Sequence, residues 1–181
     1  MQYVALLRGI NLGKRQVKMD RLKTVLESAG YADVKTLLAS GNVIFSSSEN
    51  SEGLGKKIET LLQKEFGFEI PVILRTKEEI ESLIKRDPFK GISVTKETRL
   101  YVTFRSSIES ERKEGNLQIP YVTDDGNFRM LSVSETEICS VLIVTPDRGT
   151  VDLMGIIEKE YGKNVTTRNW NTVEKIAALL S

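Results

Sequence analysis

The stretch YVALLRGINLGKRQVKMDRLKTVLESAGYADVKTLLASGNVIF, residues 3–45, carries the pattern that decides the fold. It opens with the apolar run 3–7, which has the length of a strand and stops at a loop, 8–13, that contains two glycines. Apolar residues then recur three and four positions apart, which predicts an amphipathic helix that ends at Gly30. The stripe of this helix consists of Met19, Leu22, Leu26 and Ala29.

Two short β-prone runs follow the helix. Residues 34–38 and 43–45 are separated by a turn-forming cluster and therefore predict a hairpin. A second apolar helical face spans residues 54–66, and residues 70–74 return to a strand pattern. Pro71 near the start of this last strand favours a position at the edge of the sheet, because proline donates no ladder hydrogen bond.

The order of these elements is β-α-β-β-α-β, which is the ferredoxin-like pattern. We therefore predict an α+β protein whose residues 1–76 form a ferredoxin-like βαββαβ half. Residues 77–96 are expected to form a connecting helix and loop, opened by a capping box at Thr76 and Glu79. Residues 97–181 should form a second α/β half with C-terminal helices, for which a second ferredoxin-like arrangement is a hypothesis.

The composition is that of a packed globule, with 181 residues, 40% hydrophobic and 28% charged. No apolar run approaches the roughly 18 residues that a membrane span requires. Arg8 comes too early for the apolar core of a signal peptide. We therefore expect a soluble, cytoplasmic protein without a membrane segment.

The chain contains no histidine and one cysteine, Cys139. This excludes Ser-His-Asp and Cys-His catalysis, Cys/His zinc sites and internal disulfides, since each requires a missing side chain. Carboxylate magnesium sites and lysine chemistry stay open, although the acidic pairs resemble turns and helix starts rather than metal sites. We expect no metal site and no cofactor, and Cys139 is expected to be a buried core thiol.

Five segments resemble a bacterial family of domains of unknown function whose hallmark is a start of the form LLRGIN-x-G. They are YVALLRGINLG (3–13), SGNVIF (40–45), FGFEIPVILRT (66–76), DPF (87–89) and TTRNWNTV (166–173), which contains the motif T-x-RNWNTV. Similar proteins often continue the opening with a second glycine, whereas Lys14 follows Gly13 here. The resemblance implies no established activity, substrate or cofactor.

A candidate anion site follows from the predicted topology. The first and third strands of a ferredoxin-like sheet are antiparallel neighbours, so the loop after residue 7 should meet the turn before residue 43, beside the start of the first helix. A helix N-terminus, glycines and cations are the usual components of phosphate or carboxylate sites, although short basic loops are usually only solvated. The expected ligand-binding residues here are Arg8, Gly9, Asn11, Lys14, Ser40 and Asn42.

Charge is uneven along the chain. The net charge is only +1, but residues 1–40 hold seven Lys/Arg against three Asp/Glu, a net of +4. The segment 9–14 superficially resembles a P-loop, but its spacing is one residue short and Arg15 stands in the Ser/Thr position. The aromatic stacking strand of RNA-recognition modules is also missing, so no nucleic-acid partner is expected.

A second polar cluster surrounds the chain's single tryptophan. Arg168, Asn169 and Trp170 could line a ligand cleft, with the indole stacking on a planar group and the guanidinium binding an anion. The alternative is structural, with Trp170 packed on the core at the start of the last helix. The sequence leaves both interpretations open.

Our functional hypothesis is binding of a small anionic ligand at the edge formed by the first strand and first helix. Two alternatives remain. One is a histidine-free enzyme that acts on phosphorylated or carboxylated small molecules, and the other is a protein-interaction module.

Because no Cys/His cage couples metal to folding, we predict that EDTA leaves the melting temperature unchanged. Differential scanning fluorimetry with and without EDTA tests this. A clear loss of stability in EDTA would reveal a carboxylate metal site.

Overall fold

The computed structural model describes residues 1–147 and 151–180. These residues group into two compact units, one of Met1–Ser82 with Glu174–Ser181 and one of Leu83–Val173. The domain boundaries expected from the sequence, at 76 and 97, stay a prediction. No helix in the described part of the chain is long and apolar enough to cross a bilayer.

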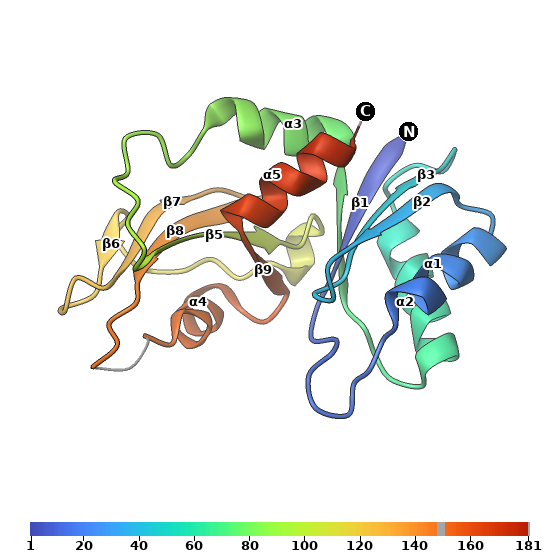
Figure 1. The fold of residues 1–181 in the computed structure, drawn as a ribbon, viewed down its shortest axis with the longest axis horizontal. Helices are drawn as coiled ribbons and strands as arrows, with labels where there is room; N and C mark the ends of the chain where they lie inside the picture. Colours follow the sequence, from blue (N-terminus) through green and yellow to red (C-terminus); the bar gives the residue numbers. More distant parts are fainter. Residues whose placement is uncertain (148–150, 181) are drawn as a thin grey trace. The chain divides into compact units, whose positions relative to one another are not determined.

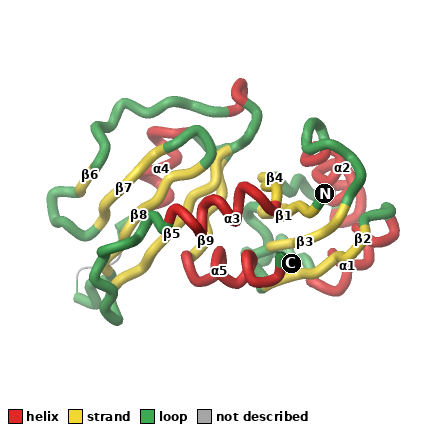
Figure 2. Tube along the Cα trace, turned by 90° about the horizontal axis from the view of Figure 1, so that it is seen from above, coloured by secondary structure: helices red, strands yellow, loops and turns green. Residues whose placement is uncertain are grey.

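The first unit contains the predicted ferredoxin-like sheet. Its strands lie in the order β2-β3-β1-β4, and every neighbouring pair is antiparallel. Figure 2 shows β1 between β4 and β3, and β4 lies at the edge, as Pro71 predicted. The elements are β1 (Gln2–Leu7), α1 (Met19–Ser28), β2 (Ala32–Leu37), β3 (Asn42–Ser46), α2 (Leu54–Phe66), β4 (Val72–Thr76) and the start of α3 (Lys77–Arg86).

The core of this unit lies between the sheet and two helices. α1 and α2 lie on one face of the sheet (Figure 1). Alternate residues of β1 point to this face and pack with the apolar stripes of the two helices. The predicted stripe of α1 is largely correct, because Leu22 and Leu26 are fully buried, but Ala29 is exposed. The core residues from these three elements include Tyr3, Ala5, Leu7, Leu22, Val25, Leu26, Leu54, Ile58 and Leu62.

The helix ends follow the local signals in the sequence. Gly30, just after α1, and Gly67, after α2, both have positive φ, which glycine adopts without strain. At the start of α3, the Thr76 backbone N–H donates to Glu79 Oε2 at 2.8 Å. The Glu79 N–H donates to Thr76 Oγ1 at 3.2 Å. This reciprocal pair confirms the predicted capping box.

The second unit also contains an antiparallel sheet, with the order β6-β7-β8-β5-β9 (Figure 2). Without β6, this order matches that of the first sheet, so the hypothesis of a second ferredoxin-like arrangement is correct for the strands. The elements are β5 (Thr98–Arg105), the 3-10 helix η1 (Glu109–Glu111), β6 (Tyr121–Val122), β7 (Phe128–Val133), β8 (Glu137–Ile143), α4 (Leu153–Tyr161), β9 (Val165–Asn169) and the start of α5 (Trp170–Leu179), whose residues from Glu174 on belong to the first unit.

The second unit differs from the ferredoxin-like pattern in its first crossover. Residues 106–127, all of which the structure describes, contain η1 and β6 but no α-helix. Buried Arg105 fastens this segment by donating to the Lys113 carbonyl at 2.9 Å and to Glu114 Oε1 at 3.1 Å. A Cβ on Gly115 would lie 2.7 Å from the Tyr161 ring, so the segment packs closely against α4.

β9 was not expected from the sequence. β9 has the polar sequence VTTRN, which lacks the alternation of a half-buried strand. α5 begins at Trp170, directly after β9.

Leu22→Ala should lower the free energy of unfolding by about 2–5 kcal/mol, because it leaves a cavity beneath α1. The matched control is Leu12→Ala, since Leu12 is 67% exposed and its truncation should cost less than about 0.5 kcal/mol. Urea titration of both variants measures the difference. Equal destabilisation would contradict this assignment of the core.

Candidate functional site

The loop between β1 and α1 has a defined, unusual backbone. Gly9, Asn11 and Gly13 all have positive φ, at 66°, 55° and 56°. Leu12 and Arg15 form an isolated antiparallel bridge, in which the Arg15 N–H donates to the Leu12 carbonyl at 3.1 Å, and the Asn11 N–H donates to the Arg15 carbonyl at 2.6 Å. Residues 8–17, called the entry loop below, are therefore a folded structure rather than a loose connection.

Asn11 fixes the entry loop to the turn between β2 and β3. Its Nδ2 donates to the Val17 carbonyl at 3.0 Å and to the Ala39 carbonyl at 2.7 Å. Its Oδ1 accepts from the Val17 N–H at 2.8 Å. The predicted convergence of the two segments is thus confirmed. Both amide hydrogens of Asn11 are used within the protein, so the residue shapes the loop.

Arg15 makes a second internal anchor. Its Nε donates to the Gly9 carbonyl at 2.7 Å, and its terminal nitrogen donates to the Glu69 carbonyl. The guanidinium carbon lies 4.5 Å from the centre of the Phe68 ring, a cation–π distance. Arg15 therefore joins the entry loop to the segment before β4 and is not one of the loop's solvent-facing cations.

The turn between β2 and β3 is equally constrained. Asn42 is fully buried, and its Nδ2 donates to the Leu37 carbonyl at 2.7 Å and to Ser40 Oγ at 3.1 Å. Asn42, which was expected to bind ligand, therefore holds the turn together from the interior. A Cβ on Gly41 would lie 2.6 Å from Ile10 Cδ1, so glycine is needed where the entry loop crosses this turn.

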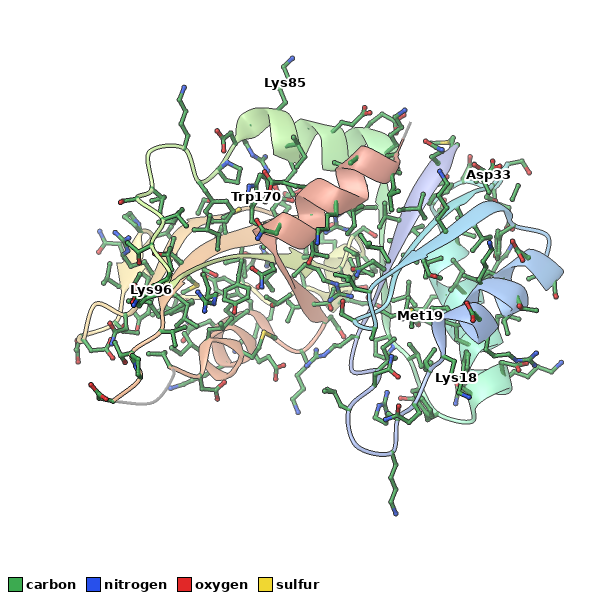
Figure 3. The ribbon with its side chains drawn as sticks, in the orientation of Figure 1. Lys18, Met19, Asp33, Lys85, Lys96 and Trp170 are labelled. Carbon is green, nitrogen blue, oxygen red and sulfur yellow. The ribbon has the colours of Figure 1, made fainter. Side chains whose placement is uncertain are left out.

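The exposed charges at this edge come from lysines. Lys14 and Lys18 are exposed and form no ion pair with any residue that the structure describes. Arg8, in contrast, is half-buried, and its backbone N–H donates to the Pro71 carbonyl. Lys18 is the N-cap of α1, and no described side chain caps this helix (Figure 3). The first turn of α1 thus presents backbone N–H groups next to a lysine.

The other predicted cluster belongs to the second unit and lies mostly in its interior. Arg168 in β9 is 6% exposed and donates to Thr166 Oγ1 at 2.8 Å and to the Thr167 carbonyl at 3.0 Å. Burial lowers the pKa of its guanidinium to about 10. The strand pattern of β9 turns Arg168 inward, which favours the structural interpretation of this cluster.

Trp170 packs within the second unit, which agrees with the structural interpretation of this cluster. Its ring contacts the Phe89 ring edge-on, with the centres 5.2 Å apart. Asn169, the last residue of β9, is exposed. The structure thus brings together the predicted residues of the entry loop and turn, while residues 168–170 form a separate group.

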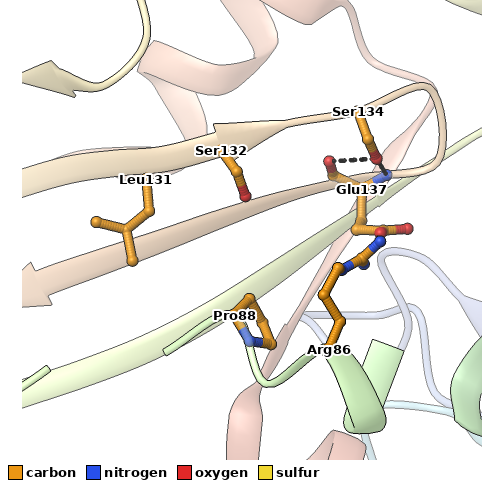
Figure 4. A pocket seen from close by; sticks show the side chains of 6 residues that line it. All are labelled: Arg86, Pro88, Leu131, Ser132, Ser134 and Glu137. Carbon is orange, nitrogen blue, oxygen red and sulfur yellow. Dashed lines mark hydrogen bonds and ion pairs between the residues drawn. The ribbon is translucent and has the colours of Figure 1, made fainter. Parts of the chain in front are cut away.

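The second unit contains a pocket of about 320 Å³ that was not expected from the sequence (Figure 4). It contains an ion pair between Arg86, at the end of α3, and Glu137, at the start of β8. The partners are 51 residues apart, and no local pattern links them. The lining residues are Arg86, Pro88, Leu131, Ser132, Ser134 and Glu137.

Cys139 is buried in β8, as expected. Burial raises the pKa of its thiol to about 11, while a hydrogen bond with Ser132 acts in the opposite direction. At neutral pH the group is a neutral thiol inside the sheet, which favours a packing role.

The family model described as "Protein of unknown function (DUF1697)" matches residues 1–127. The chain belongs to the DUF1697 family. The match includes the LLRGIN-x-G start and the entry loop, which agrees with the resemblance noted in the sequence. The C-terminal RNWNTV motif lies beyond the matched residues.

A solved structure shares the DUF1697 chain's fold. It is described as a conserved bacterial protein, SP0830, from Streptococcus pneumoniae, and it is 21% identical with a TM-score of 0.75. The alignment covers 99% of this chain and 98% of that one. The α+β fold class is thus confirmed. No curated protein matches the chain.

We predict that Asn11→Gly lowers the free energy of unfolding by about 1–3 kcal/mol, because it removes three hydrogen bonds that fix the entry loop. Asn11→Ala should cost about 1 kcal/mol more, since alanine is strained at positive φ. Urea titration of the two variants separates the hydrogen-bond effect from the backbone effect. If glycine proves as stable as asparagine, the side chain does not anchor the loop.

Proposed function

We propose that this protein binds a small anionic ligand, bearing phosphate or carboxylate, at the edge formed by the entry loop, the turn 38–41 and the start of α1. The observation that carries the proposal is that α1 begins with uncapped backbone N–H groups at Lys18. Helix N-termini in this state favour anions through both hydrogen bonds and the helix dipole.

The charges at this edge favour an anion. Lys14 and Lys18 are exposed, and no acidic residue precedes Asp20 in the sequence. Asp20 lies in the first turn of α1, where its carboxylate opposes an incoming anion. Solvent screens all three exposed side chains alike, and two lysines together with the positive end of the helix outnumber the single carboxylate.

Rigidity of the entry loop supports the same proposal. Asn11 and Arg15 hold the backbone in place through bonds to both neighbouring segments. A ligand therefore meets a surface that is already ordered, which reduces the entropic cost of binding. In this arrangement Lys14 and Lys18 contact the ligand, Arg8, Gly9 and Ser40 border it, and Asn11 and Asn42 support it from behind.

The test is a thermal-shift titration with inorganic phosphate, citrate and ATP. A ligand at one hundred times its Kd should raise the free energy of unfolding by about 2.7 kcal/mol. Lys18→Gln should weaken binding by about 1.5–3 kcal/mol, the usual effect of removing a charge-assisted hydrogen bond.

Lys35→Gln provides the matched control, since Lys35 is exposed on the edge strand β2, away from the entry loop in sequence. It makes the same charge change and should leave binding nearly unaltered. The proposal fails if none of the three anions shifts the melting temperature. It also fails if the two lysine variants weaken binding equally.

A further inference from the structure

The pocket in the second unit lies beside a β-bulge in β7. The pairing of β7 with β8 shifts register between Met130 and Ser132, so Leu131 is an extra residue. In a regular strand, neighbouring side chains point to opposite faces. Here Leu131 and Ser132 both line the pocket (Figure 4). Bulges often reorient side chains in this way beside functional sites.

Glu137 supplies a buried carboxylate to this pocket. The residue is 7% exposed, and its Oε1 accepts a hydrogen bond from Arg86. Its Oε2 accepts none from any residue that the structure describes. A carboxylate in such a position gains free energy from a second donor, because burial has removed much of its hydration.

Arg86 supplies the opposite charge from the solvent side. Its side chain is 53% exposed, and one terminal nitrogen faces Glu137. Within the described residues its remaining guanidinium nitrogens have no acceptor. The ion pair fixes the guanidinium in place and leaves donors for an anionic group from outside.

We propose that this pocket binds a small zwitterion of the α-amino acid class with an apolar side chain. The ammonium and carboxylate of such a molecule are attached to one carbon atom, so they match a carboxylate and guanidinium that touch each other. The ammonium donates to Glu137 Oε2, and the carboxylate accepts from Arg86. Pro88 and Leu131 provide apolar walls for the side chain, and about 320 Å³ is at the lower end of small-molecule pockets.

This inference does not depend on the proposed anion site, which lies in the other unit. It predicts a ligand with both charges, whereas the entry loop favours negative charge alone. The probes are L-leucine and two analogues that lack one charge each, 3-methylbutylamine and 4-methylpentanoate. NMR titration up to about 20 mM detects a Kd near 1 mM. The signals to follow are those of the Arg86 Nε–H and the backbone amides of residues 131–137.

We expect L-leucine to shift these signals in a saturable manner and each analogue to bind at least tenfold more weakly. Glu137→Gln and Arg86→Gln should each weaken L-leucine binding at least tenfold. The matched controls are Glu135→Gln and Lys85→Gln, which remove an exposed charge from a neighbouring position (Lys85 in Figure 3). Both controls should bind like the unaltered protein.

Three results would each overturn the proposal. They are absence of L-leucine binding, analogues that bind as well as L-leucine, and pocket variants that bind as well as their controls. If Glu137→Gln fails to fold, Arg86→Gln decides the matter, because Arg86 lies half-exposed at a helix end.

Discussion

The antiparallel pairing of β1 with β3 is the constraint on which the first unit depends. The register that sets Leu6 opposite Asn42 places the end of β1 beside the start of β3, so the entry loop must cross the turn 38–41. Glycine is required at position 41, where the two segments cross, and the Asn11 side chain joins the loop to the turn by donating to the Ala39 carbonyl. This one strand pairing therefore brings the entry loop, the turn 38–41 and the start of α1 to the same edge of the sheet.

The polar side chains of this protein divide into two groups with different physical roles. Asn11, Arg15, Asn42 and Arg168 are held by carbonyls and hydroxyls of the protein itself, because a buried polar group without partners is costly. The exposed side chains of Lys14 and Lys18 are outside these networks. Polar residues that suggest a binding role in the sequence are thus, in this protein, mostly used to hold the backbone in place.

The two candidate sites differ in how charge is arranged. At the edge of the entry loop, exposed Lys14 and Lys18 lie near the uncapped N–H groups of α1, so positive charge predominates there despite the Asp20 carboxylate. The pocket in the second unit contains a carboxylate and a guanidinium in contact, so its net charge is zero but its local field is strong. The DUF1697 match covers the entry loop and includes Arg86, but not Glu137.

The sequence by itself determined the features that arise from local periodicity and local caps. Apolar spacing identified α1 and α2, the box at Thr76 and Glu79 fixed the start of α3, and the β-α-β-β-α-β order implied the sheet that brings loop and turn together. Only the tertiary structure decided the rest. β9 is a strand because β5 pairs with it, and that pairing buries Arg168. The bulge at Leu131 arises in the pairing of β7 with β8, and the ion pair joins Arg86 to Glu137, 51 residues further along the chain. The residue pattern of a single helix or strand does not encode which other segment packs against it.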